Sequence, residues 1–135
     1  ITAENEDLVG VIIGVGIDLV EIGRIETILN KWEEKFLRRI YSAEEIRYCN
    51  ERARPAVHFA ARFAVKEAFL KAIGLGMGGG VCFRDIETTH DEKGKPILKL
   101  AGGAGSFLEA HDIRSVHLTI SHTNAHATAI VILER

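Results

Sequence analysis

The fold of this chain is decided by one stretch, Pro55–Gly80, which reads PAVHFAARFAVKEAFLKAIGLGMGGG. Apolar residues fill most of its positions, and Pro55 suits a first helical turn because no backbone N–H is needed there. Gly74 and Gly76 predict the end of the helix, since glycine adopts the left-handed conformation found at helix C-termini. A helix as apolar as this one is expected to be buried on most sides.

Four charged residues interrupt this apolar helix, namely Arg62, Lys66, Glu67 and Lys71. Glu67 and Lys71 are four residues apart, so they are predicted to lie on one face of the helix. A charge in a buried helix needs a partner ion, a metal or a cleft, because an uncompensated buried charge is costly. The long helix is therefore the first place to look for a functional site.

The segments around this helix predict one α+β domain. Val11–Leu19 (VIIGVGIDL) is β-branched and almost continuously apolar, which predicts a strand buried on both faces. Apolar periodicity predicts helices over Glu21–Lys31, Lys35–Ile40 and Ala43–Glu51, the last opened by the capping box Ser42-Ala-Glu-Glu45. Alternation predicts strands over Val81–Thr89, Ile97–Leu100, Ser115–Ser121 and Ala125–Leu133, with a short helix over Gly102–Asp112. We expect a single domain at 11–135 with a mainly antiparallel sheet packed on a long central helix, and an N-terminal extension or expression remnant at 1–10.

Composition narrows the class of protein. A length of 135 residues suits one domain, and a net charge of −2 gives no indication of nucleic-acid binding. Cys49 and Cys82 do not resemble a disulfide framework, so a reduced, cytoplasmic location is expected. No apolar run approaches the roughly 20 residues needed to span a bilayer, so no membrane partner is expected.

Two carboxylates, Asp18 and Glu67, stand in otherwise apolar elements. One interpretation is an internal salt bridge, either Glu67 with Lys71 or Asp18 with Arg62. The other brings both carboxylates around Mg²⁺, which takes one or two protein carboxylates and completes its shell with water and substrate phosphates. Lys66 and Lys71 would then face the phosphates. The spacing in the sequence leaves both interpretations open.

Glycine and histidine patterns are less specific. Gly74–Gly79 matches G-x-G-x-x-G, but it follows a helix and leads into a strand, which excludes a dinucleotide-binding turn. A close approach of backbone to phosphate and a plain flexible turn both remain open. His117, His122 and His126 lack the spacing of a zinc site. Ser121-His122 ends a predicted strand, where the histidine either faces a cleft or bonds to the turn backbone.

Several motifs, taken in chain order, resemble a known family. They are Gly14-Val-Gly-Ile-Asp18, Arg62-Phe-Ala-Val-Lys66-Glu67-Ala68 with Lys71-Ala72, Gly74-x-Gly76, Gly94-Lys95-Pro96 and Ser121-His122. This ordered set resembles the holo-acyl-carrier-protein synthases, small bacterial 4′-phosphopantetheinyl transferases. The resemblance extends from about Val11 to Glu134 and implies the fold of that family.

The resemblance implies a Mg²⁺-dependent transfer of 4′-phosphopantetheine from coenzyme A to a serine of apo acyl carrier protein, with release of adenosine 3′,5′-bisphosphate. It implies Asp18 and Glu67 as metal ligands and Asp18, Glu67 and Lys71 as catalytic residues. Either Glu67 or a metal-bound water would accept the serine proton. The coenzyme A contacts it implies are Arg62, Lys66, Lys71, Gly74, Gly76, Lys95, Pro96, Ser121 and His122.

The resemblance also implies a partner surface and a homotrimer with active sites between subunits. Acidic carrier protein would dock on Arg24, Ile28, Lys31, Lys35 and Arg39. Glu26, Glu33 and Glu34 dilute this basic face, so an ordinary solvated helix face is the alternative. A second hypothesis for function is a non-enzymatic module that binds carrier protein or nucleotide without transfer.

Overall fold

A computed structural model describes residues 10–74 and 80–135 of the chain. Gly76 and residues 1–9 of the predicted extension lie outside the described residues. The elements in chain order are β1 (Ile12–Glu21), α2 (Ile22–Lys31), α3 (Glu34–Leu37), α4 (Ala43–Asn50), α5 (Pro55–Ile73), the 3₁₀ turn η1 (Phe83–Asp85), β2 (Ile86–His90), β3 (Pro96–Leu100), α6 (Gly102–Ala110), β4 (Ser115–His122) and β5 (His126–Glu134).

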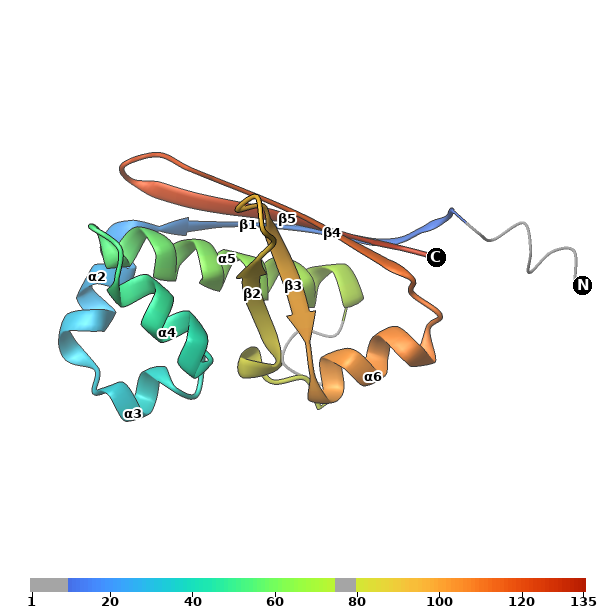
Figure 1. The fold of residues 1–135 in the computed structure, drawn as a ribbon, viewed down its shortest axis with the longest axis horizontal. Coiled ribbons are helices and arrows are strands. Elements are labelled where there is room, and N and C mark those ends of the chain that lie inside the picture. The colour runs from blue at the N-terminus through green and yellow to red at the C-terminus, as the bar shows by residue number, and fades with distance from the viewer. Residues whose placement is uncertain (1–9, 75–79) are drawn as a thin grey trace, which may run out of the picture.

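Helix α5 is the central element of the fold (Figure 1). A three-stranded antiparallel sheet of order β1-β5-β4 lies along one side of it, and α5 packs mainly on β1 and β5. Strands β2 and β3 form a separate antiparallel hairpin that also contacts α5. Helices α2 to α4 gather near the start of α5, and α6 lies toward its other end. The predicted α+β domain, with an antiparallel sheet on a long central helix, is confirmed.

Two glycines let β1 approach α5 closely. A Cβ atom added at Gly14 would overlap the carbonyl oxygen of Ala72, and one added at Gly16 would overlap that of Ala68. Alternate residues of a strand share a face, so Asp18 continues the row that Gly14 and Gly16 begin. The close contact therefore directs the Asp18 side chain toward α5.

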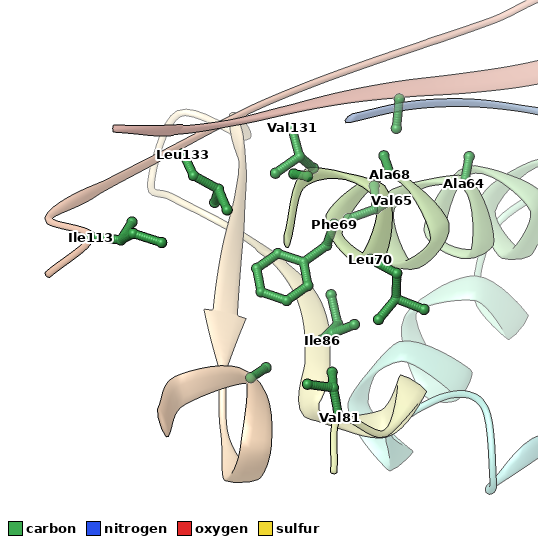
Figure 2. Packing of buried hydrophobic residues seen from close by; sticks show 13 residues of the cluster. Ala64, Val65, Ala68, Phe69, Leu70, Val81, Ile86, Ile113, Val131 and Leu133 are labelled. Carbon is green, nitrogen blue, oxygen red and sulfur yellow. The ribbon is translucent and has the colours of Figure 1, made fainter. Parts of the chain in front are cut away.

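Buried apolar residues form two clusters along α5. Figure 2 shows the first, where Phe69 and Leu70 of α5 pack with Ile86 and Val81 on one side and with Leu133 of β5 on another. The second cluster lies around the first half of α5 and joins it to α2 and α4. Its largest fully buried apolar side chains are Phe59 and Ile22. The two clusters hold both halves of α5 in place and so fix the direction in which each of its charged residues points.

The predicted helix ends are confirmed where side chains define them. Ser42 and Glu45 form the reciprocal capping box, with Ser42 Oγ accepting from the Glu45 N–H at 3.1 Å and Glu45 Oε1 accepting from the Ser42 N–H at 3.0 Å. Gly74 ends α5 in the left-handed conformation, at φ 75°. The short helix is α3 over Glu34–Leu37, whereas the sequence predicts Lys35–Ile40.

Two strand predictions need correction. Strand β1 is not buried on both faces: Val15, Ile17 and Leu19 are 56%, 56% and 65% exposed, because α5 covers one face only. The strand predicted over Val81–Thr89 begins at Ile86, and η1 precedes it. A buried lysine of α5 takes the backbone carbonyls of Phe83 and Ile86 as hydrogen-bond acceptors, which draws this segment out of an extended conformation.

Candidate active site

Asp18, Glu67 and Lys71 meet between β1 and α5. Lys71 Nζ donates to Asp18 Oδ1 at 3.0 Å and to the carbonyl oxygen of Ile17 at 2.9 Å. Burial raises the pKa of Glu67, the nearby Asp18 charge raises it further, and Lys71 acts in the opposite direction. The ion pair that forms, Asp18 with Lys71, is neither of the two pairs considered from the sequence.

The two carboxylates fit a hard divalent cation. Asp18 and Glu67 line one cavity, and the charge of each is unfavourable for the other, a repulsion that a cation between them would remove. Within residues 10–74 and 80–135, no group of three or more histidine, cysteine, aspartate or glutamate side chains could hold a metal. Two carboxylates alone suit Mg²⁺, which commonly keeps several waters or substrate phosphates in its shell.

These carboxylates line a cavity with a volume of about 750 Å³. Its walls come from β1, α2, the segment around α3, α5 and η1. Away from Asp18 and Glu67 the lining is mainly apolar, and the aromatic rings of Phe63 and Phe83 lie 5.6 Å apart in it. The two carboxylates could bind phosphate through a cation, and the mainly apolar remainder of the lining could bind an uncharged arm of the same ligand.

The five predicted partner-binding residues gather around this cavity. Arg24, Ile28 and Arg39 line it, while Lys31, Lys35 and Arg39 line an adjoining hollow of about 370 Å³. Two of the three acids expected to dilute this basic face have partners elsewhere on the surface: Glu26 pairs with Arg54 at 2.9 Å and Glu34 with Arg38 at 3.1 Å. The sole tryptophan, Trp32, also lines both hollows, and sequence reasoning gave it no role.

A group of polar and aromatic side chains, here called the Arg62 cluster, lies beside the first half of α5 and consists of Arg62, Tyr48, His58 and His90. Arg62 is 3% exposed, its guanidinium lies 4.2 Å from the ring centroid of Tyr48, and its Nε has no hydrogen-bond partner among the described residues. Burial and the Arg62 charge lower the pKa values of His58 and His90, and the His122 charge lowers that of His58 as well. Arg62, Tyr48 and His90 line a hollow of about 410 Å³.

The other predicted coenzyme A contacts are spread over the surface. Pro96 pairs with His90 in the β2–β3 register, which brings Lys95-Pro96 close to the Arg62 cluster. Ser121 and His122 end β4 and are exposed. Gly74 caps α5 at its opposite end, and Gly76 lies outside the described residues. None of the described residues in this set lines the cavity of Asp18 and Glu67.

The prediction that Lys66 contacts phosphate is wrong. Its side chain is fully buried, and Nζ donates to Glu45 Oε1 at 2.7 Å, to the Phe83 carbonyl at 2.9 Å and to the Ile86 carbonyl at 2.6 Å. An ammonium group has three protons, so these bonds use all of them. Lys66 is directed into the core while the next residue, Glu67, lines the cavity.

Sequence reasoning missed the aromatic and histidine residues of both sites. Tyr48, His58 and His90 come from α4, α5 and β2, and no spacing in the sequence links them. Alternation predicts Phe83 in a strand, whereas it faces the cavity from η1. Phe63 did carry a signal, since it recurs at helical spacing on the long helix, but that signal indicates packing as readily as ligand contact.

Comparison with known proteins assigns these features to one family. Residues 14–131 match the profile of the 4′-phosphopantetheinyl transferase superfamily. Holo-[acyl-carrier-protein] synthase of Syntrophus aciditrophicus is 51% identical over 121 residues, which are 90% of this chain and 94% of that protein.

Solved structures give the same result. Holo-[acyl-carrier-protein] synthase of Neisseria meningitidis superposes with a TM-score of 0.84 at 36% identity, covering 92% of this chain and 99% of the other. The enzyme of the same name from Helicobacter pylori, solved in complex with coenzyme A, superposes with a TM-score of 0.78 at 33% identity, covering 89% and 99%.

Proposed function

This chain belongs to the 4′-phosphopantetheinyl transferase superfamily, and we propose that it transfers 4′-phosphopantetheine from coenzyme A to a serine of apo acyl carrier protein. The observation that carries the proposal is the meeting of Asp18, Glu67 and Lys71 beside a cavity of about 750 Å³ that the two carboxylates line. Such a transfer requires mainly positioning and charge stabilisation, which two carboxylates and a lysine on rigid elements can supply.

Asp18 and Glu67 would hold Mg²⁺. When bound, the ion neutralises charge on the pyrophosphate of coenzyme A. Lys71 is half exposed at the rim of the site and already pairs with Asp18, so its ammonium is placed to bind the leaving phosphate as negative charge develops on it. This division leaves Asp18 and Glu67 to orient the reacting phosphate and Lys71 to stabilise the departing group.

The chemical step is a single displacement at phosphorus. The serine oxygen of the carrier forms a bond to the pantetheine-bearing phosphorus, and the bond from that phosphorus to the bridging oxygen breaks. Adenosine 3′,5′-bisphosphate leaves with the electron pair, and the serine proton passes to the carboxylate of Glu67.

We infer that the active site is shared between copies, because the residues expected to act together lie in two separate clusters of one chain. Arg62, His122 and the Lys95-Pro96 turn do not line the cavity of the catalytic carboxylates, although all are expected to contact coenzyme A. The outer face of β1 carries exposed Val15, Ile17 and Leu19, and Leu19 also lines the cavity rim. A homotrimer that covers this face would bring the Arg62 cluster of one copy to the cavity of the next.

The basic surface at the cavity mouth is the proposed docking site for carrier protein. Arg24, Ile28 and Arg39 line the cavity that holds the catalytic carboxylates, so a carrier docked there would present its serine close to them. Lys31 and Lys35 extend the positive charge outward and would steer an acidic partner. We also propose a cytoplasmic location, which suits the two free cysteines; within the described residues no helix is long and apolar enough to cross a membrane.

Mass spectrometry of apo carrier protein tests the proposed function. Incubation with coenzyme A, Mg²⁺ and this protein is expected to add the mass of 4′-phosphopantetheine to the carrier, and chelation of Mg²⁺ is expected to stop the reaction. An unmodified carrier, in an assay where a known transferase succeeds, would refute transfer. Calorimetry with coenzyme A then separates the alternative of a non-enzymatic module, which predicts binding that does not depend on the metal.

A further inference from the structure

The buried pair of Lys66 and Glu45 has no part in the reaction described above. Both side chains are 0% exposed, and Nζ lies 2.7 Å from Oε1. A buried ion pair is weak evidence for stability, because the loss of hydration on both ions offsets most of their attraction. The role of the pair is therefore sought in the neighbouring residues that it holds in position.

Each partner ties separate elements together. Lys66 extends from α5 to the carbonyls of Phe83 and Ile86, at the two ends of the turn into β2. Glu45, in the first turn of α4, accepts from the backbone N–H groups of Ser42 and of Thr88 in β2, at 3.0 and 3.2 Å. The pair thus connects α4, α5, η1 and β2 at a single buried point.

One of these attachments lies directly behind the cavity wall. Phe83, whose carbonyl accepts from Lys66, lines the cavity together with Phe63 and the catalytic Glu67. Its half-buried ring lies 5.6 Å from that of Phe63. Lys66 and Glu67 are adjacent in sequence, so one turn of α5 carries a catalytic carboxylate and the residue that secures the wall near it.

We propose that the Lys66–Glu45 pair is a positioning device that holds Phe83 in the wall of the cavity and thereby sets the fit of the pantetheine arm of coenzyme A. This inference rests on the proposed function, since it assigns the apolar part of the cavity to that arm. Lys66 and Glu45 touch no reacting atom. They act on the wall through the Phe83 carbonyl, and Lys66 Nζ also lies 5.6 Å from the ring centroid of Tyr41, another residue of that wall.

The test uses the full chain and a neutral replacement of the pair, Lys66→Met with Glu45→Gln, so that no unpaired charge stays buried. The Michaelis constant for coenzyme A is expected to rise about tenfold, while kcat changes by no more than about twofold. A displaced Phe83 would weaken binding of the pantetheine arm but leave the groups around the reacting phosphorus in place. Phe83→Ala is expected to give a similar rise. The triple variant should show no further rise, since both changes disturb the same contact.

Binding of adenosine 3′,5′-bisphosphate, measured by calorimetry, separates positioning from direct phosphate contact. This product lacks the pantetheine arm, so its affinity should be unchanged in the double variant, whereas a phosphate-binding lysine predicts a weaker complex. Glu109→Gln, at an exposed position of α6, is the control and should match the unsubstituted protein.

Three results would overturn the inference: a Michaelis constant at the unsubstituted value in the folded double variant, multiplied effects in the triple variant, or weakened bisphosphate binding. If the double variant fails to fold, Phe83→Ala alone decides, because an unchanged Michaelis constant there refutes the role of the wall. Failure of the unsubstituted protein to modify carrier counts against the proposed function, and calorimetric affinity for coenzyme A then tests the pair independently.

Discussion

Glu67 shows at the scale of one residue that a proposed catalytic group can carry a cost in stability. Burial and the Asp18 charge raise its pKa, so the folded protein favours the protonated carboxyl more than the unfolded chain does. The stabilising contribution of that group is present at acidic pH and is lost as the pH rises through the raised pKa. At neutral pH the ionised carboxylate is therefore a source of strain that a metal ion would relieve.

The first prediction concerns Glu67→Gln. The variant is expected to lose at least about a hundredfold in kcat, because the carboxylate both orients phosphate and accepts the serine proton. It should also melt at a slightly higher temperature than the unsubstituted protein at neutral pH without metal, since a neutral amide removes the unfavourable charge beside Asp18. Carrier mass spectrometry and thermal unfolding measure the two effects. Full activity would remove Glu67 from the catalytic set.

The second prediction concerns pH. Activity requires ionised Glu67, so kcat is expected to fall as the solution is acidified through its pKa. The pKa is raised in the metal-free protein, so at subsaturating Mg²⁺, where protons compete with the ion for this carboxylate, the fall should begin at a higher pH than for an ordinary glutamate. The profile is recorded with saturating coenzyme A and carrier, and unfolding is monitored in the same buffers. A loss of activity that only follows unfolding would contradict the assignment.

At the scale of elements, the contact between β1 and α5 is what assembles the site. Gly14 and Gly16 let the strand lie directly on the backbone of Ala68 and Ala72, and this places Asp18 within reach of Lys71. The sequence carries small residues on both elements for that reason. Since the interiors of proteins are close-packed, even one added methyl group has no room here.

The third prediction is that Gly16→Ala destabilises the fold. The added methyl would overlap the Ala68 carbonyl, so β1 must move away from α5, at a cost of about 1–3 kcal/mol or more in the free energy of unfolding. The shift should also separate Asp18 from Lys71 and lower activity beyond the loss of folded protein.

Gly23→Ala is the matched control for this substitution. Gly23 lies in α2 with no atom within 4 Å of an added Cβ, so alanine there should stabilise the protein by about 0.5–1 kcal/mol. Denaturant unfolding measures both variants. Equal stability of the two alanine variants would contradict the close-contact argument.

At the scale of the whole molecule, the outer face of the three-stranded sheet is left uncovered by the described chain. Val15, Ile17 and Leu19 are each more than half exposed along β1, whereas their neighbours Gly16 and Asp18 face α5. The apolar sequence predicts a strand buried on both faces, and one chain buries only one of them. A second copy on the outer face would reconcile the apolar sequence with the exposure.

The fourth prediction follows from that face. Ile17→Lys is expected to convert the proposed homotrimer to a monomer, because a lysine ammonium at the centre of an apolar interface loses its hydration without a partner. Activity should fall with assembly, since coenzyme A contacts would come from two copies. Analytical ultracentrifugation measures the mass. Glu109→Lys, at an exposed position of α6, is the control and should leave assembly unchanged; a monomeric unsubstituted protein would refute the trimer.

The sequence by itself determined the elements whose signals are local. The capping box at Ser42, the proline start and glycine end of α5, and the alternation of β4 and β5 depend on neighbouring residues, so their predictions were confirmed. The ordered motifs around Asp18, Glu67 and Lys71 likewise indicate the family without reference to how the chain folds. Those residues stand at fixed places in the chain because Asp18 lies on β1, whereas Glu67 and Lys71 lie one helical turn apart on α5.

Only the tertiary structure decided how distant residues pair. Asp18 pairs with Lys71, and Lys66 with Glu45, across separations in the sequence that no periodicity encodes. Lys66 and Glu67 are adjacent charged residues of one helix, and the sequence does not distinguish their environments. Lys66 is nevertheless buried in the core, whereas Glu67 lines the cavity. The physical reason is that successive helical positions lie about 100° apart, and which direction is interior depends on the elements that pack around the helix.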